Sequence, residues 1–130
     1  RLTAATLEEL EPLRCGFRAK YLLDAARRVS SGQVQLDAIP QMPLEQARAH
    51  LMQIVGVGPK VADCALLYGF HRLECCPMDV WMKRVFAALY PNGLPDCAQD
   101  FIGIAQQYLF HYARCCPQIL ETPEKEAALV

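Results

Sequence analysis

The sequence predicts an all-α fold of about six helices in a single domain that spans all 130 residues. Apolar residues recur at the three- and four-residue spacing of amphipathic helices along nearly the whole chain. Helix-start signals precede these stretches, and glycine or proline follows them. A chain of this length can also enclose a hydrophobic core. Together, these observations predict a globular helical domain.

Two helices are predicted before residue 33. Thr6, with Glu9 three residues later, forms a capping-box pattern that predicts a short helix ending near Arg14. The following stretch, GFRAKYLLDAARRVSSG, predicts a longer helix that stops at Gly32. One stripe of this helix is predicted to be buried, and it consists of Tyr21, Leu22, Ala25, Ala26 and Val29.

The middle of the chain predicts two helices joined by a glycine turn. After a linker, QLDAIPQM, Pro43 starts a helix, because proline suits the first helical turn. The residues of this helix that share a face are Leu44, Ala47, Leu51 and Ile54. Beyond the turn, Pro59 starts a helix that runs to about Leu67. Residues 43–68 thus have the pattern of a helix–hairpin–helix, which an ordinary turn between two helices matches equally well.

Two further helices are predicted after residue 78. Before them, RLECC is predicted to form a brief extended piece. Asp79 is predicted to cap the helix VWMKRVFAALY. Asp96 is predicted to cap the last long helix, CAQDFIGIAQQYLFHYARC, which a proline ends.

The composition is typical of a soluble globular protein, not of a membrane protein or a strongly basic nucleic-acid binder. Hydrophobic residues make up 53% and charged residues 21% of the chain, and the formal net charge is −1. No apolar run approaches the ~18–20 residues of a membrane span. A basic cluster nevertheless lies between residues 14 and 28, and it either faces DNA or is a solvated helix face. It consists of Arg14, Arg18, Lys20, Arg27 and Arg28.

Seven cysteines are many for this length. Four of them form adjacent pairs, Cys75-Cys76 and Cys115-Cys116, and none shows the Cys-x-x-Cys spacing typical of zinc sites. An odd number, without a secretion leader, favours reduced thiols in a cytosol. We therefore expect small core residues and no disulfide framework.

The stretch VGVGPK carries the first candidate for chemistry. Glycine amides at Gly56 and Gly58, followed by a helix N-terminus, form a natural seat for an anion such as phosphate. Lys60 lies in the first turn of that helix, whose positive end favours the unprotonated amine that nucleophilic attack requires. Taken alone, a lysine at such a position is more often a surface charge.

Three further features could support such chemistry. Asp79 could stabilise a developing positive charge, although a plain helix cap explains it fully. Cys64 lies one turn after Lys60 and shares its face. Gln106 and Phe110 are also four residues apart, and an amide beside an aromatic ring is what a pocket for a flipped nucleobase requires. Core packing is the alternative for Phe110.

Together these residues resemble a known family. IVGVGPKVADCALLYGF followed by CPMDVWMKRVF resembles the helix–hairpin–helix and Gly/Pro…Asp signature of base-excision-repair DNA glycosylases, most closely the bifunctional 8-oxoguanine DNA glycosylase/AP lyases. GFRAKYLLDAAR is similar to the wedge region of this branch, and AQQYLFHYAR is similar to its pocket helix. The resemblance covers residues 14 to 114.

The resemblance implies a role for each matching residue. Lys60 is the implied nucleophile, which attacks the sugar C1′ and forms a Schiff base, and Asp79 is the implied essential carboxylate. The implied base pocket consists of Cys64, Tyr68, Gln106 and Phe110. The implied DNA contacts are the Phe17 wedge, Arg18 on the orphaned cytosine, and phosphate-binding amides at Gly56, Gly58 and Val61. The carbonyls that match a monovalent-cation site (Na⁺ or K⁺) in relatives are those of Met52, Ile54 and Val57.

The resemblance also implies a DNA-repair enzyme that acts as a monomer on double-stranded DNA with a damaged base, away from membranes. An intracellular location is expected, in the cytoplasm or nucleoid of a bacterium or in the nucleus of a eukaryote. No iron–sulfur cluster is expected, because the cysteine pattern differs from that of the iron–sulfur glycosylases. Family members carry an N-terminal β-rich domain without a counterpart here, so residues 1–130 are expected to be the C-terminal, catalytic part of a longer protein. Met78 and Trp81 depart from the residue types of animal members.

The expected function is therefore excision of 8-oxoguanine, followed by cleavage of the abasic strand through β-elimination. Two alternatives remain open. The first is a lysine-type glycosylase for another damaged base, similar to endonuclease III. The second is a non-catalytic helix–hairpin–helix module that binds the DNA backbone.

Overall fold

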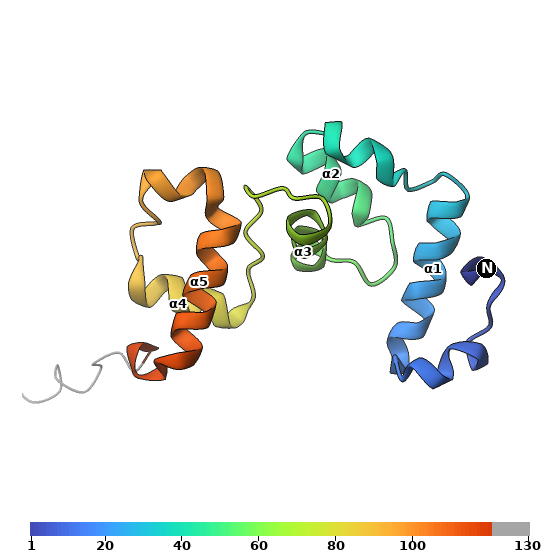
Figure 1. The fold of residues 1–130 in the computed structure, drawn as a ribbon, viewed down its shortest axis with the longest axis horizontal. Helices are drawn as coiled ribbons and strands as arrows, with labels where there is room; N and C mark the ends of the chain where they lie inside the picture. Colours follow the sequence, from blue (N-terminus) through green and yellow to red (C-terminus); the bar gives the residue numbers. More distant parts are fainter. Residues whose placement is uncertain (121–130) are drawn as a thin grey trace, which may run out of the picture. The chain divides into compact units, whose positions relative to one another are not determined.

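All regular secondary structure that the computed structural model describes, over residues 1–120, is helical. The α-helices in Figure 1 are α1 (Ala19–Ser30), α2 (Leu44–Leu51), α3 (Pro59–Gly69), α4 (Val80–Leu89) and α5 (Ile102–Cys115). The 3₁₀ segments are η1 (Leu2–Ala4), η2 (Glu8–Leu13), η3 (Gly16–Arg18), η4 (Leu36–Gln41), η5 (Asp96–Phe101) and η6 (Pro117–Leu120). The prediction of an all-α fold is confirmed. None of the helices in this described part has the length and hydropathy of a membrane span.

The chain forms two compact units, residues 1–66 and 67–130, with the boundary inside α3. The first unit holds α1, α2 and most of α3, and the second holds the end of α3 together with α4 and α5. A single domain over residues 1–130 stays a prediction.

The predicted capping box opens the first unit. The Thr6 N–H donates to Glu9 Oε2 at 2.8 Å, and the Glu9 N–H donates to Thr6 Oγ1 at 3.2 Å. The helix that follows, η2, is 3₁₀, because Pro12 lies inside it and has no N–H to donate. Arg14 ends it in the left-handed conformation, with φ of 51°.

Helix α1 lies within its predicted boundaries, and Gly32 follows its C-cap with φ of +75°. The predicted buried stripe is wrong at Leu22 and Val29, which are 40% and 36% exposed. Leu23 is the buried residue of α1. The helix packs against η1 and η3, and these neighbours, not the periodicity of α1 alone, determine which side is covered.

The predicted linker before α2 is wrong, because most of it forms η4. Ile39 of this segment is fully buried, as is Val34 just before it, so the segment contributes to the core of the first unit. His50 of α2 fixes the start of η4, since its Nε2 accepts the Gln35 N–H at 2.9 Å. The contact joins residues fifteen positions apart, which a local sequence pattern does not show.

The predicted helix–turn–helix over residues 43–68 is present as α2, a tight turn and α3. Ala47 and Leu51 of α2 are buried, as predicted, and Ile54 is buried in the turn. The two helices are joined by an ion pair in which Arg48 Nε donates to Asp63 Oδ1 at 2.7 Å. This pair holds the turn between two fixed helices.

Two predictions in the second unit are wrong. RLECC is not extended, because the Cys75 N–H donates to the Arg72 carbonyl at 3.1 Å and closes a turn. Asp96 does not cap α5 but is the first residue of η5. The rest of η5 separates Asp96 from the start of α5, whose N-cap is Phe101.

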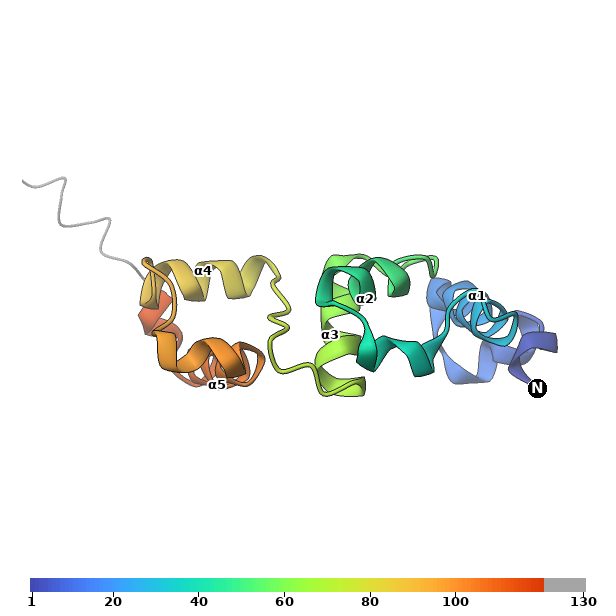
Figure 2. The same ribbon diagram turned by 90° about the horizontal axis from the view of Figure 1, so that it is seen from above.

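Helices α4 and α5 pack against each other in the second unit (Figure 2). The buried centre of this contact, called here the α4–α5 core, consists of Met82, Val85 and Ala113. Gly103 in α5 lies against the loop before α4, and its N–H donates to the Leu73 carbonyl at 2.9 Å. A Cβ at this position would overlap the carbonyl oxygen of Cys75. Only glycine allows α5 to start so close to that loop.

Candidate nucleic-acid interface and active site

The turn between α2 and α3 presents backbone amides without protein partners. The Val57 N–H donates to the Ile54 carbonyl at 3.0 Å and closes the turn. Gly56 adopts φ of +85°, a left-handed conformation that favours glycine. Within residues 1–120, the N–H groups of Gly56, Gly58 and Val61 have no hydrogen-bond acceptor. At the N-terminus of α3, such amides fit the predicted phosphate seat.

Helix α1 holds this turn at two points that were not predicted from the sequence. Tyr21 packs on Gly56 so closely that a Cβ on the glycine would lie 2.5 Å from Tyr21 Cδ2. Asp24 Oδ2 accepts the Val55 N–H at 2.7 Å and Arg28 Nε at 2.8 Å. The Val55 N–H, assisted by the Arg28 guanidinium, lowers the pKa of the Asp24 carboxyl despite the opposing effect of burial. The carboxylate therefore anchors the turn in its ionised form.

Lys60 lies in the first turn of α3 and is exposed. Cys64 lies one turn later on the same face and is half-buried, and Tyr68, a further turn along, is 62% exposed. Between the first two, Asp63 is buried and bonded to Arg48, which fixes the rotation of α3 about its axis. The lysine amine is thus accessible to a ligand, while the helix that carries it is anchored.

Asp79 caps α4 as predicted. Its Oδ1 accepts the Met82 N–H at 2.8 Å. This bond holds the carboxylate rigidly, since it removes the rotational freedom of the side chain. Lys60 belongs to the first unit and Asp79 to the second, so their action as a pair stays a prediction.

The two predicted pocket residues of α5 have structural partners in the second unit. Gln106 is 3% exposed, its Nε2 donates to the Pro77 carbonyl at 3.2 Å, and its Oε1 accepts from Gln107 Nε2. Phe110 packs against the α4–α5 core. These contacts give both side chains a packing role, and their contact with a base stays a prediction.

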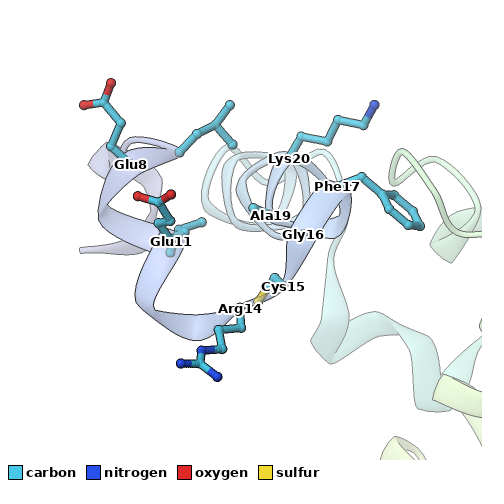
Figure 3. Close-up of a pocket in the computed structure, with 10 residues that line it drawn as sticks. Glu8, Glu11, Arg14, Cys15, Gly16, Phe17, Ala19 and Lys20 are labelled. Carbon is cyan, nitrogen blue, oxygen red and sulfur yellow. The ribbon is translucent and has the colours of Figure 1, made fainter.

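Phe17 and Arg18, the predicted wedge residues, form the end of η3 directly before α1. Phe17 is 65% exposed, and the Arg18 guanidinium carbon lies 4.7 Å from the centroid of its ring. A cavity of about 710 Å³ lies between η2 and the start of α1, with Glu8, Glu11 and Phe17 among its lining residues (Figure 3). In that view Phe17 projects away from the two glutamates. An exposed, cation-backed ring at a helix start fits the predicted wedge.

The basic cluster divides into exposed and paired members. The exposed members are Arg14, Arg18, Lys20 and Arg27. Arg28 is half-buried and paired with Asp24, so its charge supports the fold of the first unit. Contact of the exposed members with DNA stays a prediction.

The carbonyls predicted to bind a monovalent cation lie around the hairpin turn. The Ile54 carbonyl accepts the Val57 N–H, whereas those of Met52 and Val57 accept no backbone hydrogen bond within residues 1–120. Carbonyl oxygens are ligands that hard cations prefer, so these three fit such an ion. In the same part of the chain, no group of three or more His, Cys, Asp or Glu side chains could hold a metal ion.

Known proteins match this chain over most of its length, although no protein-family profile does. The "Probable N-glycosylase/DNA lyase" of Methanothermobacter thermautotrophicus is 34% identical over 119 residues, which cover 84% of this chain and 38% of the relative. A structure of MBOgg1 with a low-affinity DNA ligand matches with a TM-score of 0.77 and 43% identity, over 89% of this chain and 44% of that one. A third match is the 8-oxoguanine glycosylase/lyase of Clostridium acetobutylicum, solved with double-stranded DNA that contains cytosine opposite 8-oxoguanine. It matches with a TM-score of 0.73 and 34% identity, over 87% of this chain and 42% of that one.

This chain belongs to the helix–hairpin–helix DNA glycosylase superfamily. It spans less than half the length of these glycosylase relatives, between 38% and 44%. The side chain of Trp81 contains a buried donor that stands out within the second unit. Its Nε1 is buried and has no hydrogen-bond partner within the described residues, which is rare for a buried donor.

Proposed function

We propose that this chain is the catalytic part of a DNA glycosylase/AP lyase that excises 8-oxoguanine from duplex DNA. One observation carries the proposal: an accessible Lys60 lies in the first turn of α3, among amides at Gly56, Gly58 and Val61 that have no protein acceptor within residues 1–120. A phosphate on those amides would bring the adjoining sugar to the lysine amine. The relatives named above, glycosylases and lyases, support this function.

In the proposed reaction, the Lys60 amine attacks the sugar C1′, and the bond from C1′ to the base breaks. The base leaves with the bonding electron pair. The sugar ring then opens to a Schiff base on Lys60, and β-elimination cuts the strand on the 3′ side. The Asp79 carboxylate stabilises the positive charge that develops on the sugar, which requires a fixed anion of the kind that its cap bond provides.

The remaining predicted residues bind and orient the DNA. The residues that hold the extruded base are Cys64, Tyr68, Gln106 and Phe110. Their contacts with the base must compensate for the few kcal/mol that unstacking it costs. Phe17 fills the gap in the duplex, and Arg18 contacts the orphaned cytosine. A Na⁺ or K⁺ ion on the carbonyls of Met52, Ile54 and Val57 would stiffen the hairpin turn. The protein would act as a monomer on DNA, in the cytoplasm or nucleoid of a bacterium or the nucleus of a eukaryote.

Borohydride trapping tests this function. The chain is incubated with duplexes that carry 8-oxoguanine opposite cytosine, an abasic site, or neither, and a covalent adduct is expected with the first two only. Lys60→Gln should abolish the adduct and leave duplex binding intact, because the hairpin amides are unchanged. Lys83→Gln, at an exposed lysine of α4, is the matched control. Asp79→Asn should slow excision while the chain stays folded, since asparagine also caps helices.

The same experiment separates the two alternatives. A lysine-type glycosylase for another base would form the adduct with abasic DNA and not with 8-oxoguanine. A backbone-binding module would bind all three duplexes and form no adduct. Equal loss of folding in Lys60→Gln and Asp79→Asn would mean that both residues are structural.

A further inference from the structure

Tyr21 lies at the centre of contacts that join the start of α1 to the hairpin turn. Its ring meets the ring of Phe17 edge-on, with centroids 6.0 Å apart and planes at 81°. The same ring covers Gly56, and a Cβ there would lie 2.5–2.7 Å from three of its atoms. Phe17 and Gly56 therefore contact one ring, although they belong to different elements.

Asp24, almost one turn further along α1, fixes a second point of the turn. Its Oδ2 accepts the Val55 N–H at 2.7 Å, and Val55 directly precedes Gly56. Helix α1 thus holds two consecutive residues of the turn. The turn cannot rotate against α1 without breaking this hydrogen bond or driving Gly56 into the Tyr21 ring.

We propose that Tyr21 is a positioning residue that couples the insertion of Phe17 into the duplex to the seating of a DNA phosphate on the hairpin. The proposal rests on the proposed function, in which Phe17 is the wedge and the Gly56 amide binds phosphate. Phe17 is 65% exposed, so its direction depends on the Tyr21 edge and on Arg18 over its ring. With Tyr21 in place, the wedge and the phosphate seat keep a fixed separation. Without the ring, Phe17 loses one of these two constraints and enters the base stack less often in the productive orientation.

The test compares Tyr21→Leu with Tyr21→Phe in the whole chain. Phenylalanine keeps the ring, and none of the contacts above uses the hydroxyl, whereas leucine removes the aromatic edge. The probe is a duplex with a tetrahydrofuran abasic-site analogue opposite cytosine and 2-aminopurine beside it, whose fluorescence rises on unstacking. Tyr21→Leu should slow this rise roughly two- to thirtyfold, and Tyr21→Phe should match the unaltered chain. Duplex affinity and its salt dependence, which report phosphate contacts, should change little in both.

A double variant distinguishes coupling from general loosening. In a Phe17→Ala background, Tyr21→Leu should slow the residual rise no further, because the ring that it positions is gone. Equal rates for Tyr21→Leu and Tyr21→Phe, additive effects in the double variant, or no fluorescence rise with the unaltered chain would each overturn the proposal. If thermal unfolding shows that Tyr21→Leu does not fold, Tyr21→Met takes its place with the same expected result, since its flexible side chain can fill the space over Gly56.

The proposal and the enzymatic function fail in different ways. A borohydride adduct with abasic DNA, together with a fluorescence rise that does not depend on Tyr21, refutes the coupling alone. A fluorescence rise that depends on Tyr21, without any adduct, refutes the lyase activity and supports the coupling.

Discussion

Asp63 Oδ1 lies 2.7 Å from Arg48 Nε, and this ion pair joins the two helices of the hairpin. The hydrogen bond to Asp63, followed by that to Glu45, raises the pKa of the Arg48 guanidinium. Asp63 is 9% exposed, so the pair is largely shielded from solvent. Removal of Arg48 would leave the buried Asp63 charge without compensation.

Arg48→Met should therefore lower the free energy of unfolding by about 1–3 kcal/mol. Adding Asp63→Leu should recover most of this loss, because neither side chain then carries a charge. Urea unfolding of the single and double variants measures the coupling. Glu45→Gln is the control, since its side chain is 81% exposed and its pair should contribute less than about 1 kcal/mol. Additive losses in the double variant would contradict this prediction.

Stability should also depend on pH through Asp24. Its pKa in the folded chain lies below the ordinary value of 3.8, so the ionised form favours folding. The contribution of Asp24 to the free energy of unfolding is fully present when the pH is above the ordinary pKa, and it is lost as the pH falls through the lower pKa of the folded chain. Asp24→Asn should thus be less stable than the unaltered chain by a constant amount near neutral pH, and the difference should shrink below about pH 4. Chemical unfolding between pH 7 and pH 2 measures it; a difference that stays constant to pH 2 would exclude this carboxyl as its source.

Gly103→Ala should destabilise the second unit. The added methyl group would overlap the carbonyl oxygen of Cys75 and the side chain of Leu67, and backbone atoms cannot move aside cheaply. Overpacking of this kind costs about 1–3 kcal/mol. Gly69→Ala is the matched control, because a Cβ there meets nothing within 4 Å and the backbone is not left-handed. Thermal unfolding should separate the two variants, and equal melting temperatures would contradict the structure at Gly103.

Phe110→Ala should weaken excision of 8-oxoguanine by one to two orders of magnitude, because base–aromatic stacking is worth roughly 1–3 kcal/mol. Cleavage at a preformed abasic site, which has no base to hold, should be spared. Gln106→Ala should also weaken excision of 8-oxoguanine, by a smaller factor, and should likewise spare cleavage at the abasic site. Leu109→Ala is the control for packing, since Leu109 also contacts the α4–α5 core without a predicted contact to the base. Equal losses of both activities in Phe110→Ala would make this ring a core residue only.

Features that depend on residues within one helical turn could be predicted from the sequence. The Thr6–Glu9 capping box and the Asp79 cap both join groups three residues apart, and both are present. The fold class also follows from periodicity, because a helix has the same period wherever it packs. Lys60 could be placed in a first turn because a proline precedes it.

Contacts between elements could not be predicted in this way. Asp24 and Val55 are 31 positions apart, and nothing in either neighbourhood indicates the other. The exposure of Leu22 depends on where η1 and η3 pack, which the period of α1 does not contain. Gln106 fits a pocket by chemistry, yet its bond to the Pro77 carbonyl, 29 positions away, depends on how α5 lies against the loop before α4.

The close approach of Tyr21 to Gly56 has a consequence for mutational tolerance. In a library selected only for folding, with no DNA present, every side chain at position 56 meets the tyrosine ring and a left-handed backbone. Position 56 should therefore reject substitution even in a population that never repairs a lesion. Gly58 has open space around it and an ordinary backbone conformation, so it should accept alanine under the same selection. Rejection of alanine at position 58 that appears only when survival requires DNA repair would then report contact with DNA.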